Sequence, residues 1–355
     1  PALNVIVVDN ASSDRSLETV DDLPVEKIAL EQNGGFGHGC NAGWRSGEAP
    51  YVLFLNPDAQ IEPAAVERLA TVLDQSPAAG AVAPRIVHVD GTLDYSLRRF
   101  PRLRSTYARA LFLHRVFPKA SWTDELVREP AVYHRPGSPD WVSGACLLVR
   151  RTALEEIDGF DEGFFMYCED IDLCRRLRDA GHDLLYDPEA AVSHIGGASA
   201  PRASLLPVLA ASRIRYASKH WSRPAALLER CGVALEALTH VVVSQGGRAA
   251  RAATDGLSCS RSRGRPRPSR PARSTDVLLA ERPSPLFRMV TSVPGAVCGI
   301  CGVIQLRGEP RPVVAPEVLD RMTDAMTHRG PNDRGTFAAI VGSMRYSRYC
   351  RIAIG

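Results

Sequence analysis

Residues 3–14, with the sequence Leu-Asn-Val-Ile-Val-Val-Asp-Asn-Ala-Ser-Ser-Asp, join an apolar, β-branched run to a cluster of small polar residues. The run at residues 3–8 predicts a strand buried on both faces of a parallel sheet. The three polar residues at 12–14 are typical helix caps, so a helix is expected to follow. Asp9 would end the strand at the sheet edge where α/β proteins bind ligands, and could accept a hydrogen bond from a base or ribose. Taken alone, the pattern favours a simple capped turn.

The alternation of strands and helices continues outward from this stretch to about residue 200, which predicts a mostly parallel α/β sheet. Further strands are expected at residues 27–30, 51–55, 81–83 and 141–149, and helices at residues 63–75 and 170–180. Two long helical patterns follow at residues 204–220 and 224–243. A chain of 355 residues has room for more than one domain, and two are expected.

Composition excludes several classes of protein. With 45% hydrophobic and 23% charged residues, the chain has the apolar content of a globular protein, not of a disordered or collagen-like one. It has no apolar run of about 18 residues and no basic segment at its start, so neither a spanning helix nor a signal peptide is predicted. Nine cysteines at irregular spacing indicate reduced thiols and not a disulfide framework. These features together predict a cytoplasmic protein.

Residues 33–43, Asn-Gly-Gly-Phe-Gly-His-Gly-Cys-Asn-Ala-Gly, form a glycine-dense stretch between a predicted strand and a predicted helix. Glycines in such a position let backbone amides approach a phosphate, and the start of a helix favours an anion. The stretch is not a P-loop, because no Gly-Lys-Ser/Thr follows it. On its own it is a weak indication of a nucleotide site.

Residues 53–58, Leu-Phe-Leu-Asn-Pro-Asp, end a predicted strand in a carboxylate. An acid at the end of a strand can bind a hard divalent cation whose other ligands come from phosphate and water. An Asx turn leading into the next helix explains the same residues about as well.

Residues 160–173 place Glu169, Asp170 and Asp172 in an apolar and aromatic neighbourhood. Neighbouring carboxylates there can have separated pKa values, so that one of them acts as a general base. The alternative is a set of acids at a helix start, stabilised by the helix dipole. His194 follows another short predicted strand, where a single histidine is more often structural than a ligand.

In this order and spacing, the stretches resemble the family 2 glycosyltransferases with a GT-A fold, and most of all the rhamnosyltransferase-type members that build bacterial polysaccharides. The residues that carry the resemblance are 8–14, 33–43, 55–58, 141–145 and 159–173. The resemblance covers about residues 1–220. It implies a GT-A, Rossmann-like, mostly parallel sheet. It also implies an inverting, metal-assisted transfer of a sugar from a nucleoside diphosphate sugar to a polysaccharide or lipid-linked acceptor.

The resemblance further implies roles for individual residues. Asp170, with Glu169 beside it, matches the acid pair that supplies the catalytic base. Asp58 matches the family's metal-binding acid and His194 its later metal or phosphate ligand, for Mg²⁺ or Mn²⁺ acting as a Lewis acid on the diphosphate. The nucleotide-sugar site would comprise Asp9, Asn10, Asn33, Gly35, Phe36, Asn41, Asn56 and Asp58. The acceptor site would comprise Trp141, Ser143 and Gly144.

The chain departs from the family pattern in two places. Asn56 stands where the family's Asp-x-Asp pattern has its first acid, which leaves fewer charges for a metal. The strand at residues 3–8 resembles the family's second strand, so the expected sheet lacks its first strand. A sheet without that inner strand exposes unpaired edges.

Residues 98–117 mix basic and bulky apolar side chains. Such a segment could rest on an anionic membrane surface beside a lipid-linked acceptor, at the inner face of the membrane. A solvated amphipathic helix with one packed face explains the pattern equally well.

Residues 246–296 carry ten arginines and three acidic residues and are rich in Pro and Ser, with no helix or strand period. They predict a disordered linker. The near absence of aromatic residues there argues against a nucleic-acid partner. The expected domains are a glycosyltransferase domain at residues 1–222, a C-terminal helix at 223–245, this linker, and a separate fragment at 297–355.

Residues 297–303 and 328–335 resemble the start of the class II glutamine amidotransferase domain of asparagine synthetases. The resemblance implies a short fragment of an Ntn-type α+β domain, and glutamine-dependent amide transfer as an alternative function. In that family the nucleophilic cysteine is the first residue, and its free α-amine serves as the base. Cys298 has an amide in that place, so it would be a nucleophile only if released, and an inert thiol is expected. The chain is thus more easily explained as two gene fragments read as one than as a bifunctional enzyme.

Overall fold

The computed structural model describes residues 2–12, 16–56, 59–88, 90–194, 202–259 and 300–307. The main-sheet strands are β1 (Ala2–Asp9), β2 (Glu26–Ala29), β3 (Tyr51–Leu55), β4 (Ala59–Ile61), β5 (Ala79–Val87), β8 (Cys146–Arg150), β9 (Asp183–His194) and β10 (Ile300–Arg307). They form one eight-stranded sheet in the order β2-β1-β10-β3-β8-β5-β9-β4. Two short strands, β6 (Leu97–Arg98) and β7 (Trp141–Val142), pair separately.

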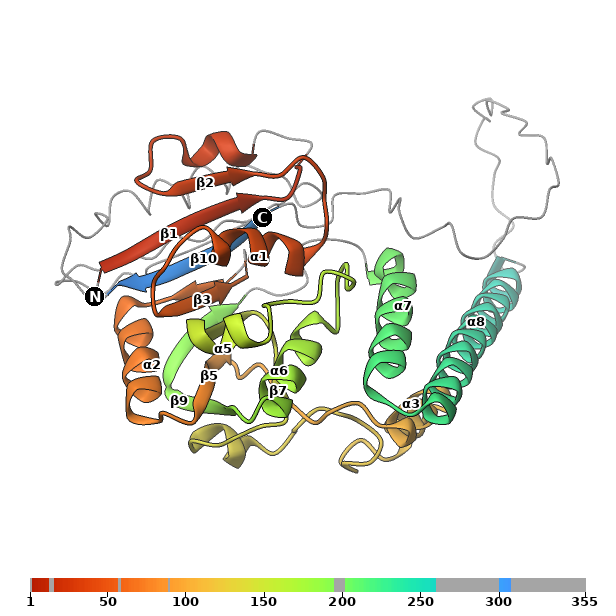
Figure 1. Ribbon diagram of the computed structural model, residues 1–355. Coiled ribbons are helices and arrows are strands. Elements are labelled where there is room, and N and C mark those ends of the chain that lie inside the picture. Colours follow the sequence, from red (N-terminus) through yellow and green to blue (C-terminus); the bar gives the residue numbers. More distant parts are fainter. Residues whose placement is uncertain are drawn as a thin grey trace, which may run out of the picture.

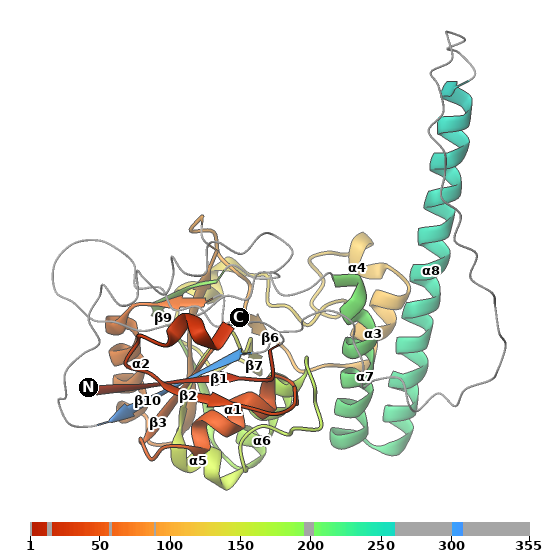
Figure 2. The same cartoon turned by 90° about the horizontal axis from the view of Figure 1, so that it is seen from above.

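Helices pack against this sheet and extend beyond one end of it (Figure 1). The elements near the sheet are η1 (Ser16–Val20), α1 (Phe36–Arg45), α2 (Pro63–Gln75), η2 (Pro130–His134), α5 (Arg151–Glu156) and α6 (Glu169–Asp179). The elements beyond it are α3 (Leu103–Ala110), α4 (Leu113–Val116), α7 (Arg202–His220) and α8 (Arg223–Cys259). Seen from above, these last four lie together at one side of the molecule (Figure 2).

The sheet is buried on both faces because its inner strands place apolar residues on both sides. In β1, Val5 and Val7 belong to one core cluster with residues of α2, whereas Ile6 and Val8 belong to a second cluster with residues of α1, α5 and α6. Successive side chains of a strand point to opposite faces, which explains this division. The continuous apolar run therefore specifies a central strand covered on both sides.

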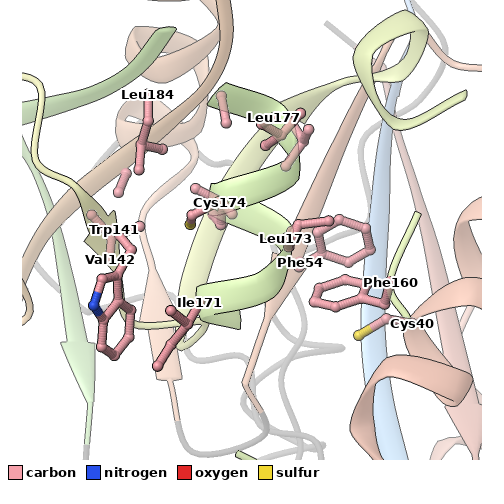
Figure 3. Packing of buried hydrophobic residues seen from close by; sticks show 14 of the residues in the cluster. Cys40, Phe54, Trp141, Val142, Phe160, Ile171, Leu173, Cys174, Leu177 and Leu184 are labelled. Carbon is pink, nitrogen blue, oxygen red and sulfur yellow. The ribbon is translucent and has the colours of Figure 1, made fainter. Parts of the chain in front are cut away.

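Helix α6 is held by the second of these clusters. Figure 3 shows Ile171 directed toward Trp141, and Leu173 directed toward Phe54 and Phe160. The Phe54 and Phe160 rings meet edge to face with centroids 4.9 Å apart. Because the helix is fixed along its length, the residues of its first turn have a defined place beside the sheet.

Most of the elements expected from the sequence are confirmed. The strands at residues 3–8, 27–30, 51–55 and 81–83 and the helices at 63–75 and 170–180 agree with the structure to within a few residues. The expected strand at 141–149 is divided into β7 and β8 by a turn at residues 143–145. The expected helix after residue 12 is the short 3-10 turn η1.

The expectation of a mostly parallel sheet is wrong. Among the described strands, β1–β2 and β5–β9 pair in parallel, and the other five pairings are antiparallel. The sequence pattern did not show this because a buried strand reads as the same apolar run in either direction.

Two further expectations need correction. The sequence predicted that the sheet lacks an inner strand, and that residues 297–355 start a separate Ntn-type domain. Strand β10 lies antiparallel between β1 and β3, with Val303 in register with Ile6 on one side and Phe54 on the other. Its backbone thus pairs with two edges that would otherwise be open. Cys298, the rest of the expected amidotransferase fragment and the linker beyond Cys259 lie outside the described residues.

Helix α8 corrects the boundary of the expected linker. It runs from Arg223 to Cys259, so residues 246–259 are helical and not disordered. Ala and Arg, both good helix formers, dominate residues 248–253, and the first proline after Pro224 is Pro266. No helix in the described part of the chain is long and apolar enough to cross a membrane.

Candidate active site

Three acids, Glu169, Asp170 and Asp172, occupy the first turn of α6, as the sequence led us to expect. The turn before them is unusual, because Tyr167 and Cys168 have φ values of 65° and 64°. Non-glycine residues seldom adopt this left-handed conformation, and strain of this kind concentrates at functional sites. The turn places Glu169 and Asp170 side by side, with Glu169 8% exposed.

The two carboxyls differ in their hydrogen bonds. Asp170 accepts a hydrogen bond from the Gly144 N–H at 3.1 Å and another from the Ile171 N–H at 2.8 Å. Glu169 Oε2 is buried and accepts no hydrogen bond from the described residues. Backbone donors favour the ionised form of a carboxyl, whereas burial without donors favours the neutral form. The negative charge of the pair therefore resides preferentially on Asp170.

The pKa values agree with this division. Burial, with a smaller contribution from the charge of Asp170, raises the pKa of Glu169 to about 8. Burial also raises the pKa of Asp170, but the Gly144 and Ile171 amides oppose the rise. Burial thus favours the neutral form of Glu169, whereas the two backbone amides favour the ionised form of Asp170. A buried carboxylate of raised pKa is a suitable general base.

The loop at residues 141–144 forms a wall beside these acids. A Cβ atom added to Gly144 would lie 3.3 Å from Asp170 Cβ, so glycine permits the close approach of the loop. Trp141 donates its indole N–H to the Arg99 carbonyl at 2.9 Å, and Ser143 donates its backbone N–H to Ser96 at 3.2 Å. These bonds fix the loop that the sequence analysis assigned to the acceptor.

The predicted nucleotide residues gather at the ends of β1 and β2. Asn10 is buried, donates to the Gly35 carbonyl at 2.7 Å and accepts from the Gly34 N–H at 3.1 Å. Asn33 accepts from the Gly35 N–H at 3.0 Å, and Asp9 accepts from the Ser12 N–H at 3.0 Å. The asparagines therefore shape the glycine-rich loop.

The glycine-rich loop is tied directly to the segment that leads into α6. Phe36 donates its backbone N–H to the Phe165 carbonyl at 3.1 Å. Gly35 has φ 91°, and a Cβ there would lie 1.9 Å from that same carbonyl oxygen. Only glycine fits this position. The glycine-rich loop and the carboxylate pair are thus joined four residues before Glu169.

Asn41, predicted to contact the nucleotide, has a different position. It is 1% exposed, donates to the Phe160 carbonyl and Glu162, and accepts from the Phe160 N–H and the Trp44 indole. These four bonds use all the polar capacity of the amide. In place of the expected direct contact, Asn41 positions the loop between residues 159 and 162.

Asn56 lies beside the turn at residues 143–145, because its backbone N–H donates to the Ala145 carbonyl at 2.8 Å. His194 ends β9 in register with Ala59, the residue that follows Asp58 in the sequence. Asp58 itself lies outside the described residues. In the described ranges, no group of three His, Cys, Asp or Glu side chains is placed to hold a metal ion.

The sequence motifs did not point to two charged residues that lie near the site, Arg98 and Asp94. Arg98 lies with its guanidinium carbon 5.3 Å from the centre of the Trp141 ring, and its charge favours ionisation of Asp170. The sequence analysis had assigned it to a basic surface segment. Asp94 lies 3.8 Å from the His194 ring, an interaction that keeps the pKa of Asp94 below its usual value. No motif pointed to it.

Asp172 differs from its two acidic neighbours. It is fully buried and accepts hydrogen bonds from Arg176, Lys219 and His220 at 2.7 to 3.0 Å. Burial alone would raise its pKa, but these partners lower it. Asp172 therefore anchors α6 to α7 as a permanent carboxylate, which leaves Glu169 and Asp170 as the pair with adjustable protonation.

The chain is similar to a known protein family over its first 157 residues. The model of the family described as glycosyl transferase family 2 matches residues 1–157. This region includes the glycine-rich loop and the loop at residues 141–144. The match favours the glycosyltransferase interpretation over the glutamine amidotransferase one.

Two curated relatives are rhamnosyltransferases. The N-acetylglucosaminyl-diphospho-decaprenol L-rhamnosyltransferase of Mycobacterium tuberculosis (strain H37Rv) is 34% identical over 205 residues, covering 54% of this chain and 66% of that protein. Rhamnosyltransferase WbbL of Escherichia coli (strain K12) is 31% identical over 165 residues, covering 43% of this chain and 58% of that protein. The chain thus spans less than two thirds of the length of either relative.

Among solved structures, the mannosyltransferase PcManGT from Pyrobaculum calidifontis, in complex with GDP-Man and Mn²⁺, is similar with a TM-score of 0.39. The sequence identity is 17%, over 73% of this chain and 71% of that one.

Proposed function

From the glycosyl transferase family 2 domain that residues 1–157 form, we propose that this chain is an inverting glycosyltransferase. It would move a sugar from a nucleoside diphosphate sugar to a hydroxyl of a glycan or lipid-linked acceptor. The observation that carries the proposal is the buried Glu169–Asp170 pair beside the loop at residues 141–144, in which Asp170 accepts a hydrogen bond from the Gly144 N–H and burial raises the pKa of Glu169 to about 8.

In this reaction Asp170 is the general base. It takes the proton from the acceptor hydroxyl as the oxygen attacks the anomeric carbon from the face opposite the diphosphate. The bond from the anomeric carbon to the diphosphate breaks, and the configuration inverts. Glu169 stays protonated, and burial holds the pKa of Asp170 above its usual value.

The glycine-rich loop binds the donor in this proposal. Asn10 and Asn33 hold the loop from behind, and the start of α1 lies at its end. Backbone N–H groups at a helix start favour phosphate oxygens. Asp9, at the end of β1, would contact the base or ribose.

A divalent cation is part of the proposal. Its protein ligands would be Asp58 and His194, and its other ligands would come from the diphosphate and water. The backbone register supports this set, because His194 lies opposite the residue that follows Asp58. When bound, such a cation supplies Lewis-acid stabilisation of the leaving diphosphate.

The substrate class follows from the relatives. Both curated rhamnosyltransferases suggest a rhamnosyl donor, and the name of the mycobacterial enzyme suggests a polyprenyl diphosphate-linked amino sugar as acceptor. We therefore propose that the acceptor is lipid-linked and that transfer takes place beside a membrane.

A donor panel tests the proposal. The chain is incubated with uridine, guanosine and thymidine diphosphate sugars, with a polyprenyl diphosphate-linked acceptor and with Mg²⁺ or Mn²⁺, and nucleoside diphosphate release is measured. We expect one donor to be consumed only when the acceptor is present. Release that is independent of acceptor, or full activity in Asp58→Ala, would show that the site assignment is wrong.

A further inference from the structure

Arg98 lies between the loop at residues 141–144 and the carboxylate pair. It stands opposite Trp141 in the antiparallel pair of β6 and β7. Directly opposed residues of such a pair project from the same face, and the Arg98 guanidinium carbon accordingly lies 5.3 Å from the centre of the Trp141 ring. The charge of Arg98 also reaches Asp170, where it favours the ionised carboxyl. Arg98 is therefore held close to the proposed base.

The guanidinium of Arg98 lacks the partners that such a group usually has. Its Nε is buried and donates no hydrogen bond to the described residues, and it forms no ion pair with a carboxylate among them. The next residue differs, because the Arg99 guanidinium pairs with Glu129 at 3.6 Å and donates to the Leu126 carbonyl at 3.2 Å. A partly buried cation loses hydration, and Arg98 has no such bonds to offset the loss.

A second buried polar group without a partner lies two residues before Arg98. Ser96 is 3% exposed, and its Oγ has no hydrogen-bond partner among the described residues. Leu97, between the two, belongs to β6 and to the buried core. Side chains two residues apart on an extended segment project from the same side. Ser96 and Arg98 therefore present a hydroxyl and a guanidinium together, on the side away from Leu97.

This pair of donors suits a phosphate group. The planar guanidinium matches phosphate oxygens with two parallel N–H donors, and a hydroxyl donates to a further oxygen. Carboxylates of this chain do not take that place. Asp94 and Asp170 both feel the charge of Arg98, but neither forms an ion pair with it. The donors of Arg98 are thus available to a ligand.

Both substrates of the proposed reaction can carry a diphosphate, and the geometry of the reaction distinguishes them. In an inverting displacement the base and the attacking hydroxyl lie on one face of the sugar, and the leaving group lies on the opposite face. Arg98 lies near the base Asp170 and against Trp141, which is on the proposed acceptor side. A phosphate bound by Arg98 is therefore on the side of attack, where it belongs to the acceptor.

We propose that Arg98 and Ser96 form a subsite for the diphosphate that joins the acceptor sugar to its lipid. The guanidinium donates to the phosphate oxygens, and the Ser96 hydroxyl donates to another oxygen of the same group. The inference rests on the proposed function and extends it, because it assigns the residues that distinguish a lipid-linked acceptor from an uncharged glycan.

Direct binding to the full chain tests the proposal. The chain is titrated by calorimetry, without donor or metal, with N-acetylglucosaminyl diphosphate bearing a short prenyl chain. A second titration uses the same sugar joined to the same chain by an uncharged glycosidic bond. The wild type should bind the charged ligand about tenfold more tightly or better, the effect of a charged hydrogen bond. Arg98→Gln should remove this preference and bind the uncharged ligand as the wild type does.

Two further variants separate ligand binding from a structural role. Arg99→Gln is the matched control and should keep the preference, since the Arg99 side chain already pairs with Glu129. Ser96→Ala should lower the preference about threefold without lowering the unfolding midpoint, because its Oγ bonds to none of the described residues. A purely structural role would lower the midpoint and leave the preference intact. Circular dichroism of each variant confirms that it is folded.

The proposal is overturned if the wild type does not prefer the charged ligand, or if Arg98→Gln keeps the preference. It is also overturned if Arg98→Gln instead weakens only the binding of uridine, guanosine or thymidine diphosphate, since the diphosphate would then belong to the donor. Failure of the proposed function gives a different result. The subsite stands and the function fails if the charged ligand is preferred but no donor supports transfer, whereas transfer without any preference for charge gives the reverse conclusion.

Discussion

Replacing Glu169 with glutamine should stabilise the folded chain at alkaline pH. The carboxyl is buried, its Oε2 accepts no hydrogen bond from the described residues, and its pKa is raised from 4.5 to about 8. The folded state therefore binds this proton more tightly than the unfolded chain. The stability that the protonated form contributes is complete below about pH 4.5 and is lost as the pH rises through about 8.

The size of the effect follows from that interval. At about 1.4 kcal/mol per pH unit, the difference between 4.5 and about 8 corresponds to roughly 5 kcal/mol at about pH 9. Glutamine keeps the shape of the side chain and stays neutral. Local relaxation reduces the gain, so we expect Glu169→Gln to recover at least about 2 kcal/mol, or roughly 4 to 8 °C in the unfolding midpoint.

Thermal unfolding followed by circular dichroism at about pH 5 and about pH 9 measures this gain. The variant should match the wild type at the lower pH and exceed it at the higher pH. Glu155→Gln, at an exposed position of α5, is the matched control and should shift neither midpoint. The carboxyl is not held neutral by burial if the unfolding midpoints of Glu169→Gln and the wild type differ by the same amount at both pH values. The same conclusion holds if the variant is less stable than the wild type at the higher pH.

Three further substitutions test the glycine-rich loop, the buried Asn41 amide and strand β10. Gly35→Ala should prevent the contact between the glycine-rich loop and the Phe165 carbonyl, and so abolish donor binding in a titration while the chain stays folded. Asn41→Ala should cost about 1–3 kcal/mol in urea unfolding, because buried polar partners lose their bonds, and should raise the donor KM; unchanged stability would contradict its positioning role. Val303→Pro should lower stability by about 3 kcal/mol or more, since it removes a backbone donor from an inner strand; an unaltered midpoint would place β10 outside the sheet.

The local elements were predictable because their signals are local. The apolar run at residues 3–8 and the proline-started helix at 63–75 each carry their own pattern, and both are confirmed. Strand direction and order were not predictable, because they depend on partners far away in the sequence. The pairing of β10 with β1 joins segments about 300 residues apart, and no periodicity encodes that contact.

The sequence motifs predicted which residues gather at the candidate site, but not what each residue does there. The acid pair at Glu169 and Asp170 follows from the sequence, but the choice between base and proton holder needs the Gly144 and Ile171 amides. Asn41 belongs to the glycine-rich motif, yet all four hydrogen bonds of its amide go to Trp44 and to residues 160 and 162 of the protein.

The central claim is that Asp170 is the base of a glycosyl transfer reaction, and one measurement tests it most directly. The rate of acceptor-dependent transfer by Asp170→Asn is compared with the wild type, while donor binding is titrated on the same preparations. Asp179→Asn, at the exposed far end of α6, is the matched control. We expect Asp170→Asn to transfer at least about 100-fold more slowly with unchanged donor affinity, since a positioned base contributes about 10²–10⁴-fold. Transfer at the wild-type rate by that variant would contradict the account.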